Sequence, residues 1–406
     1  MRIVQINSVC GRGSTGKICV AVSELLSKKG VDNYILYSRW RSDYPLATKY
    51  GNDHDAKWQA FREKLYGTCG FEAKRATRNL IKCLAEIKPD IVHLHILHSH
   101  DCNLTMLFDY LRNKHIKVFW TFHDCWAITG YCPHFDMINC AKWKVSCGHC
   151  PDWKRFSWFF DRSEEMLNRK KTMVEGLDLT IITPSEWLAG IVKDSFMKDF
   201  PVKVINNGID LNVFKPMRHK DVGFDDVKKQ YGLDGKKILL GVANVWSESK
   251  GLSDYCKLAA VLPDDMRIVL IGLDEGQRTD LPQNILGLPR TKTQEELVDW
   301  YSLADVVLNL SYEETFGMTT VEGFACGTPC VAYNKTASKE FDDGATCIVV
   351  DAGNMDKVMI AIKDLLKQDG DGLKQQCRER ALRQYDQKDV LGKYVELYSD
   401  QLVGCL

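Results

Sequence analysis

Three features are missing from this sequence: a long apolar run, an excess of charge of one sign, and an export signal. No stretch of about 18 apolar residues occurs, so no segment predicts a transmembrane helix. Lys plus Arg and Asp plus Glu both number 54, and nucleic acid is therefore not expected as the main partner, because binding it needs a basic surplus. Residues 1–6 turn polar too soon for a signal peptide and predict a first strand instead.

The length and composition are those of a globular protein with more than one domain. A chain of 406 residues is too long for one ordinary core and predicts two domains of about 150–200 residues each. The 16 cysteines are scattered, many of them in apolar surroundings, where a free thiol behaves as a small hydrophobic group. Without an export signal we expect a cytoplasmic protein in which disulfides do not form.

The first half of the chain alternates short β-branched runs with amphipathic stretches. This order predicts a parallel sheet covered by helices on both faces. The predicted strands are Arg2–Ile6, Tyr34–Tyr37, Ile91–His95, Lys117–Phe122, Leu179–Thr183 and Lys203–Ile205. The predicted helices are Ile18–Lys28, 72–87, Leu104–Arg112 and Ser163–Glu175. Residues 125–160 break the alternation and predict an irregular, cysteine-rich insertion.

The alternation then restarts, which predicts a second doubly wound domain. Its predicted strands are Lys237–Val242, Arg267–Gly272, Val306–Asn309 and Cys330–Ala332, and its predicted helices are Gly251–Val261, Thr293–Ser302, Thr319–Cys326 and Met355–Lys367. We therefore expect an α/β fold of two Rossmann-like domains, 1–206 and 207–386. The last predicted helix, in 387–406, has no following strand and is expected to return to the first domain.

Residues 311–322 follow a predicted strand and open a predicted helix, where a doubly wound domain binds its ligands. The backbone amides at this helix start would cradle a diphosphate or a sugar hydroxyl. These amides belong to Gly317, Met318 and Thr319. Glu322 could accept a hydrogen bond from a ribose diol, and Glu314 from a donor sugar. Judged on spacing alone, two solvated carboxylates are the simpler interpretation.

Four motifs together favour the functional interpretation. Glu314 and Glu322 enclose Phe316-Gly317 and are followed by the sequence Ala-Cys-Gly-Thr-Pro. The other three motifs are Asn207-Gly208-Ile209-Asp210, Pro89-Asp90-Ile91-Val92-His93 and Thr121-Phe122-His123-Asp124. Over nearly its whole length the chain resembles the family 4 retaining glycosyltransferases of GT-B fold. The resemblance implies two domains that face each other across a cleft, with the donor bound by the second and the acceptor by the first.

The resemblance also implies roles for residues around the donor. Lys250 would neutralise the charge that develops on the departing diphosphate, and Asn244 would supply a hydrogen bond. A lysine at a helix start opposes the helix dipole, which favours an anion beside it. The family usually has an arginine five residues before this lysine, where this chain has Val245. One charge of the phosphate clamp is therefore missing.

His123 ends a predicted strand, and in the family such a histidine contacts the donor sugar near the reacting centre. A satisfied core histidine is the alternative interpretation. His93, His95, His98 and His100 form a second group, which we interpret as lining or structural residues rather than metal ligands. No catalytic metal is expected.

The run Gly11-Arg12-Gly13-Ser14-Thr15-Gly16-Lys17 almost matches the phosphate loop of nucleotide hydrolases. The next residue is Ile18 instead of Ser or Thr, so the Mg²⁺ ligand of that loop is absent and a kinase or ATPase is disfavoured. The amides from Gly13 through Thr15 to Gly16 are predicted to approach the donor diphosphate, with a tight turn as the alternative.

The insertion contains Cys132, Cys140, Cys147 and Cys150, and the last two flank Gly148-His149 like a metal knuckle. A closed site of four thiolates would be structural, and Zn²⁺ is its expected ion. Free thiols or disulfides are the alternatives. Half of the ten tryptophans lie between Trp120 and Trp158, beside basic residues. They would form a sugar-stacking wall, a patch that meets lipid headgroups, or a small aromatic core.

We therefore expect a retaining hexosyltransferase that uses a UDP- or GDP-linked sugar and a glycan or lipid-linked acceptor. Synthesis of capsule, exopolysaccharide or O-antigen at the inner face of the plasma membrane is the expected setting. A GT-B phosphorylase, a nucleotide-sugar epimerase, and a non-catalytic binding protein that uses the cysteine-rich module are the alternatives. Neither the donor sugar nor the linkage can be derived from the sequence, because specificity depends on loop side chains.

Overall fold

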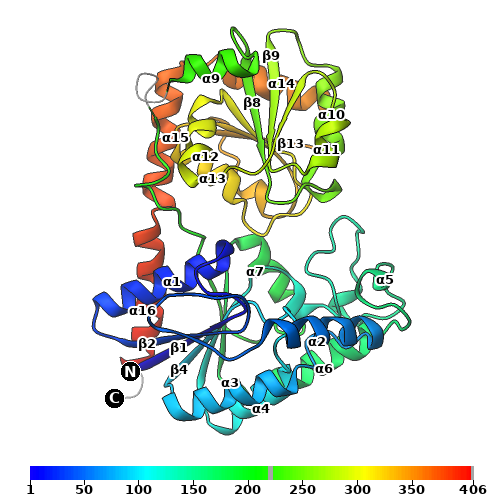
Figure 1. Ribbon diagram of the computed structural model, residues 1–406, viewed down its shortest axis with the longest axis vertical. Coiled ribbons are helices and arrows are strands. Elements are labelled where there is room, and N and C mark those ends of the chain that lie inside the picture. Colours follow the sequence, from blue (N-terminus) through cyan, green and yellow to red (C-terminus); the bar gives the residue numbers. More distant parts are fainter. Residues whose placement is uncertain (218–222, 404–406) are drawn as a thin grey trace. The chain divides into compact units, whose positions relative to one another are not determined.

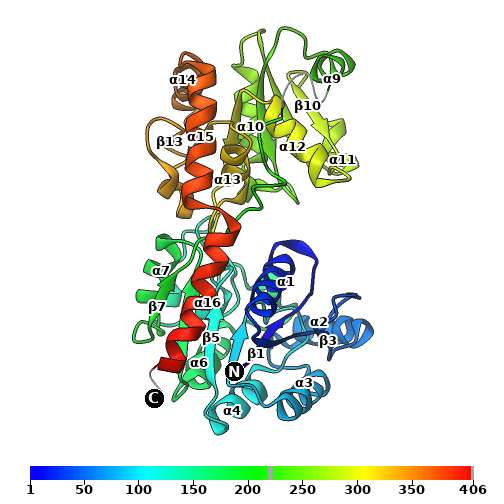
Figure 2. The same cartoon turned by 90° about the vertical axis from the view of Figure 1, so that its left-hand side faces the viewer.

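The computed structural model describes residues 1–217 and 223–403, and the side chains of 223–400 in the second range. The chain divides into two compact units, each shown in Figures 1 and 2. Unit 1 comprises Met1–Ile205 and Leu391–Leu406, and unit 2 comprises Asn206–Val390. The first boundary was expected after residue 206 and lies after residue 205. The second was expected after residue 386 and lies after residue 390. Residues 218–222 and 404–406 of the expected domains lie outside the described part of the chain.

Unit 1 is built on a seven-stranded parallel sheet in the order β3-β2-β1-β4-β5-β6-β7. Its strands are β1 Arg2–Asn7, β2 Asp32–Tyr37, β3 Ala47–Lys49, β4 Ile91–Leu94, β5 Lys117–Thr121, β6 Leu179–Thr183 and β7 Val202–Val204. From β1 the chain adds strands first on one side and then on the other. The order therefore reverses between β1 and β4, and the loops after these two strands diverge there.

Helices cover both faces of this sheet. The helices of unit 1 are α1 Gly13–Lys28, α2 Asp53–Tyr66, α3 Lys74–Ile87, α4 Leu104–Asn113, α5 Trp153–Phe156, α6 Ser163–Val174, α7 Glu186–Lys193 and the end of α16 Gln387–Val403. In Figure 1, α1 and α16 lie on one face, and α3, α4 and α6 on the other. Strand alternation explains this: Val92 and Leu94 join the core beneath α3 and α4, whereas His93 meets Tyr398 of α16. No helix in the described part of the chain is long and apolar enough to span a bilayer.

Unit 2 contains a six-stranded parallel sheet in the order β10-β9-β8-β11-β12-β13. Its strands are β8 Lys237–Val242, β9 Met266–Ile271, β10 Ile285–Leu288, β11 Val306–Asn309, β12 Cys330–Tyr333 and β13 Cys347–Val350. Its helices are α9 Phe224–Tyr231, α10 Leu252–Ala260, α11 Glu275–Thr279, α12 Gln294–Leu303, α13 Met318–Ala325, α14 Met355–Leu366 and α15 Gly370–Gln384. Here the strand order reverses between β8 and β11. The fold class expected from the sequence, two doubly wound Rossmann-like domains, is confirmed.

The segment Asn207-Gly208-Ile209-Asp210 enters unit 2 beside the segment that leaves it. Ile209 donates to the Tyr385 carbonyl at 2.8 Å and accepts from the Gln387 amide at 3.0 Å. A Cβ at Gly208 would lie 2.7 Å from the Cα of Gln387, so only glycine lets the two backbones approach this closely. The glycine of this motif thus has a structural reason that is independent of any ligand.

The sequence-based assignments were wrong in two respects. Helix α1 begins at Gly13 and not at Ile18, so the second half of the glycine-rich run is its first turn. Several elements were also missed. The strands β3, β10 and β13 are short and lie at sheet edges, while α2 carries no continuous apolar stripe. The strands and α-helices that the sequence analysis omitted are β3, β10, β13, α2, α5, α7, α9, α11 and α15.

Candidate functional sites

In unit 2 the predicted donor residues gather where the strand order reverses. The loop after β8 runs through Asn244 to Lys250, and the loop after β11 runs through Glu314 to Gly317. These two loops touch: the Tyr312 amide donates to the Ser249 carbonyl at 2.8 Å. In open parallel sheets, ligands bind outside the carboxyl ends of the strands, at the point where the strand order reverses.

Lys250 and Glu314 form the ionic centre of this region. The Lys250 Nζ lies 2.6 Å from Glu314 Oε1 and also donates to the Glu313 carbonyl at 3.3 Å. Both side chains are half-buried. The Glu314 backbone is fixed in turn, since its amide donates to Thr336 Oγ1 at 2.9 Å. The anion expected beside Lys250 is therefore present within the chain itself, and the structure brings together two of the three predicted catalytic residues.

Glycine is required on both sides of this pair. Gly251 has a φ of +75° and a Cβ there would overlap the Leu310 carbonyl oxygen. Gly317 has a φ of +106° and precedes α13, which therefore starts with open amides at Met318 and Thr319. A Cβ at Gly317 would lie 2.9 Å from the Phe341 ring. The helix start is thus held close to the neighbouring loop, as a cradle for an anion requires.

Glu322 lies one turn inside α13 and has a partner that the sequence analysis missed. The Tyr301 hydroxyl on α12 donates to Glu322 Oε2 at 2.7 Å. Tyr301 is fully buried, and this burial together with the Glu322 charge raises the pKa of its phenol. Tyr301 therefore stays a hydrogen-bond donor and orients the carboxylate. No sequence pattern marks it, because a buried tyrosine on an amphipathic helix looks like a core residue.

Three further predictions for unit 2 have different outcomes. The Phe316 side chain is buried and packs on Phe341 and Tyr385, with ring centroids 5.7 and 5.9 Å apart. Phe316 can therefore offer a ligand its backbone but not its ring. Asn244 is exposed at the reversal of strand order. Val245 is exposed as well, so the position where the family has an arginine carries no charge in this chain.

In unit 1 a chain of hydrogen bonds links His123 to the sheet. Gln5 donates through Nε2 to the Cys19 carbonyl at 2.9 Å, so its Oε1 accepts from His95 Nε2 at 3.3 Å. His95 Nδ1 then accepts from His123 Nε2 at 3.2 Å. The tautomers of both rings follow from the orientation of the glutamine amide. This relay holds the His123 ring at the carboxyl end of β5, where the sequence predicted it.

These histidines are neutral at physiological pH. Burial lowers the pKa of His123 to about 4 and that of His93 to about 3, and it holds the pKa of His95 well below its usual range. His93 is a structural residue, since its Nδ1 meets the Tyr398 hydroxyl at 2.5 Å and its Nε2 meets Thr121 Oγ1 at 2.8 Å. A neutral His123 serves as a hydrogen-bonding group rather than as a positive charge.

Asp124 pairs with a different histidine from its neighbour in sequence. His98 Nε2 lies 2.8 Å from Asp124 Oδ2. Burial opposes both charges, but the pairing prevails: it raises the pKa of His98 and lowers that of Asp124 to about 2. Asp124 also accepts from the Trp126 amide at 2.8 Å. The pair therefore anchors the beginning of the cysteine-rich insertion against the loop after β4.

Asn7 is hydrogen-bonded to the glycine-rich run. It is the second residue, after Tyr301, whose positioning role the sequence analysis did not predict. The buried Asn7 side chain donates to the Val9 carbonyl at 2.9 Å and to Thr15 Oγ1 at 3.4 Å. Its Oδ1 accepts from the Ile96 amide at 3.2 Å. Asn7 thus ties the start of α1, which contains Gly13, Thr15 and Gly16, to the loop after β4. The open amides of this helix start lie where the strand order of unit 1 reverses.

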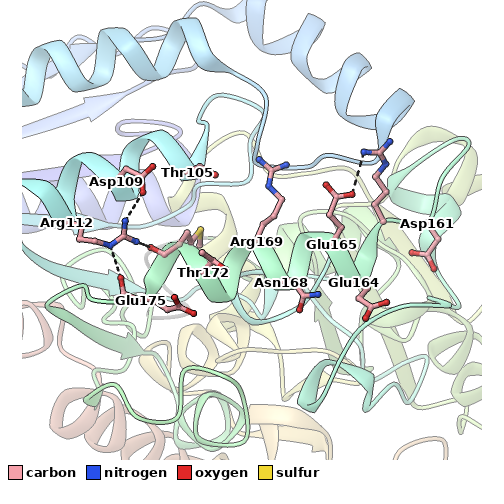
Figure 3. A pocket seen from close by; sticks show the side chains of 12 residues that line it. Thr105, Asp109, Arg112, Asp161, Glu164, Glu165, Asn168, Arg169, Thr172 and Glu175 are labelled. Carbon is pink, nitrogen blue, oxygen red and sulfur yellow. Dashed lines mark hydrogen bonds and ion pairs between the residues drawn. The ribbon is translucent and has the colours of Figure 1, made fainter.

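A groove on unit 1 lies apart from all these residues (Figure 3). It runs between α4 and α6 and is lined by side chains of both charges. Several of these neutralise one another: Arg112 bonds Asp109 at 2.7 Å, and Arg162 lies 3.5 Å from Glu165. None of the predicted site residues lines this groove. We interpret it as a solvated surface between two helices.

The comparisons with known proteins agree with this arrangement. The profile described as "Glycosyl transferases group 1" matches residues 223–384, and that described as "Glycosyltransferase Family 4" matches residues 16–213. The chain is 23% identical over 233 residues to the putative colanic acid biosynthesis glycosyl transferase WcaC of Escherichia coli, covering 52% of this chain and 55% of that protein. It is 29% identical over 166 residues to the processive diacylglycerol alpha-glucosyltransferase of Acholeplasma laidlawii, covering 39% and 49%. The chain spans about half the length of the curated relatives it matches.

Solved structures share the fold over the whole chain. Sucrose-phosphate synthase of Thermosynechococcus elongatus has a TM-score of 0.69 at 16% identity and covers 99% of both chains. HepE of Anabaena in complex with UDP-glucose has a TM-score of 0.69 at 14% identity and covers 98% of this chain and 100% of that one. Identities this low show the fold alone.

Proposed function

Since the chain belongs to the family 4 glycosyltransferases of GT-B fold, we propose that it transfers a sugar from a nucleotide diphosphate donor, with retention of anomeric configuration. The observation that carries this proposal is the Lys250–Glu314 pair, 2.6 Å apart at the reversal of strand order in unit 2. A lysine held there beside an open helix start suits a diphosphate, and a carboxylate beside it suits the hydroxyls of a sugar.

The chemistry expected of these residues is positioning and charge neutralisation. As the bond from the anomeric carbon to the diphosphate breaks, negative charge grows on the phosphate oxygens. Lys250 and the amides of Met318 and Thr319 are fixed in advance and would stabilise that charge. The departing phosphate would take the acceptor proton on the same face of the sugar, so no carboxylate nucleophile is required. His123, neutral and held by His95, would hydrogen-bond a sugar hydroxyl.

Two readings of the sequence become less favoured. The curated relatives described above are transferases, which favours transfer over a phosphorylase or an epimerase. The formed ion pair and helix start favour a working site over a vestigial one, although Val245 removes one charge from it. A UDP- or GDP-linked donor is proposed, because the residues described suit a diphosphate and a sugar, and none of them selects a particular base.

Glu322 is proposed to accept from the ribose diol of the donor. Replacing it by alanine is expected to weaken the binding of UDP or GDP by about tenfold or more, since a charge-assisted hydrogen bond contributes about 1.5–3 kcal/mol. Calorimetric titration of both nucleotides into the parent and into Glu322→Ala measures this. Asp299→Ala, which removes a carboxylate from the neighbouring helix α12, is the control and should bind both nucleotides like the parent. Equal affinity of parent and Glu322→Ala would remove the assignment.

The acceptor is proposed to be a glycan carried on a lipid, on the basis of an aromatic surface on unit 1. This aromatic patch consists of Trp58, Phe61, Tyr66, Trp158, Phe159 and Phe160, all of them exposed. Three of these rings are in contact: Phe61 packs on both Trp58 and Trp158, each with ring centroids 5.4 Å apart. Exposed basic residues lie close to these rings in the sequence, namely Lys57, Lys64, Lys154 and Arg155. Aromatic rings with cations beside them suit the interface of an anionic membrane.

Replacing two aromatic residues of this patch should weaken membrane binding. The Trp158→Ser/Phe159→Ser variant is expected to bind vesicles of phosphatidylglycerol and phosphatidylcholine at least tenfold less tightly than the parent, measured by co-sedimentation. Leu382→Ser changes an exposed apolar residue of unit 2 and serves as the control. The aromatic patch would have to be reinterpreted as a sugar-stacking wall if the parent itself did not sediment with the vesicles.

A further inference from the structure

The insertion between β5 and α6 keeps a defined course with almost no regular structure. Within it only the 3-10 turns η1 Trp126–Ile128 and η2 Lys142–Lys144 and the one-turn α5 are regular. Segments of this length in a compact domain need a specific stabilising feature. All four of its thiols after residue 130, those of Cys132, Cys140, Cys147 and Cys150, line one cavity of about 20 Å³. That volume holds a single water or ion.

Two of the four thiols already interact with each other. The Cys132 thiol is hydrogen-bonded to the Cys150 sulfur. The Gly130 amide donates to Cys147 Sγ at 3.4 Å. Between Cys147 and Cys150 the backbone turns through Gly148 at φ +121° and His149 at φ +44°. Left-handed backbone at a histidine costs about 1 kcal/mol, so this reversal needs a compensating interaction.

Two ammonium groups lie beside the cavity. Lys142 lines it, and its Nζ donates to the carbonyls of Gly148 and His149 at 3.0 and 2.7 Å. The Lys170 Nζ, fully buried, lies within electrostatic range of Cys147 and Cys132. Four thiolates around a divalent ion carry a net charge of −2, which lysines placed here would offset.

We propose that Cys132, Cys140, Cys147 and Cys150 bind one Zn²⁺ in a closed, structural site. On binding, the four thiols lose their protons to solvent and four Zn–S bonds of about 2.3 Å form. No position is left for water, so the ion has no part in sugar transfer. It closes the insertion that carries Trp158, Phe159 and Phe160 of the aromatic patch.

One other cluster competes for a metal. It consists of Glu63, Cys69 and His100. Among the residues that the structure describes, these three each offer a ligand atom that lies within 4.8 Å of the other two. The four thiols lie farther apart than this and must draw together around the ion. Glu63 Oε2, however, is already hydrogen-bonded to His100 Nδ1. Cys69→Ser therefore provides the control that separates the two clusters.

Elemental analysis of the purified full chain tests the proposal. We expect about one zinc per chain in the parent, in Cys69→Ser and in Cys256→Ser, and less than about 0.2 in Cys147→Ser. Cys147→His keeps a nitrogen ligand and should retain the metal. Zinc below 0.2 per chain in the parent overturns the proposal. So does zinc that is lost with Cys69→Ser and kept with Cys147→Ser.

A second measurement uses the parent protein alone, so that it does not depend on whether the cysteine variants fold. The parent, stripped of metal by a chelator under reducing conditions, is digested with trypsin before and after one equivalent of Zn²⁺ is returned. We expect cleavage at Lys142, Lys144, Lys154 and Arg155 to slow at least tenfold with zinc, while cleavage in unit 2 is unchanged. Equal rates with and without zinc contradict a structural ion in the insertion.

Discussion

Replacing Lys250 with alanine is expected to lower kcat by about 10²–10³-fold with a much smaller change in donor affinity. The expected size of the fall in kcat follows from the loss of a fixed positive charge at the point where negative charge develops in the transition state. The half-buried ion pair with Glu314 contributes about 1 kcal/mol or less to stability, so the variant should fold. Steady-state kinetics with the donor that the parent uses measures the effect.

Lys237→Ala is the matched control for that experiment. Lys237 also forms an ion pair in unit 2, at 3.0 Å to Asp305, but it begins β8 and therefore lies at the opposite end of the strand from the Lys250 loop. We expect its kcat to stay within about twofold of the parent. If Lys250→Ala kept the parent's kcat, the diphosphate would have to be stabilised elsewhere, and the role of the Lys250–Glu314 pair would be structural.

Lys170→Met is expected to lower the free energy of unfolding of unit 1 by about 3–5 kcal/mol. The Lys170 Nζ donates to the carbonyls of Trp126 and Thr129 at 2.7 and 3.0 Å, and lies 3.4 Å from the Trp126 ring centroid. Lys170 also donates to the Gly130 carbonyl at 3.4 Å. Methionine fills the same space but leaves the Thr129 and Gly130 carbonyls without this donor, and each unsatisfied carbonyl costs about 1–3 kcal/mol. Urea unfolding followed by tryptophan fluorescence reports the change, because Trp126 lies at the contact.

The adjacent residue offers the control. Lys171 also donates to a carbonyl of the insertion, that of Val145 at 3.0 Å, but it does so at the surface. Lys171→Met should therefore stay within about 0.5 kcal/mol of the parent. Comparable losses in the two variants would mean that the insertion is held by its surface contacts and that Lys170 is not its buried anchor.

The central strands of both units were predictable because each is a short apolar run bounded by turn residues. β6, β8 and β11 have the bounds expected from the sequence. Edge strands such as β13 bury fewer side chains and leave a weaker pattern. Helix α2 was missed because Trp58 and Phe61 point to solvent, so that its apolar residues do not mark a buried face.

The candidate sites were predictable where chemistry requires a particular residue type at a particular place in the fold. Glu314, Lys250 and His123 fall at carboxyl ends of strands, and the resemblance selected them. Tyr301 and Asn7 were not predictable, because each acts through a partner that only tertiary packing supplies: Glu322 for Tyr301, and Thr15 and Ile96 for Asn7. The Lys250–Glu314 pair was also unforeseen, since 64 residues separate its members.

Nucleotide release from a panel of nucleotide diphosphate sugars, with the parent and Lys250→Ala assayed side by side, is the most direct measurement of the proposed sugar transfer. We expect the parent to release UDP or GDP from at least one donor, to leave the sugar in the donor's anomeric configuration as seen by NMR, and to exceed Lys250→Ala by about 10²-fold or more. A parent that binds and turns over none of the donors, or that matches Lys250→Ala, would contradict a donor site built on Lys250 and Glu314.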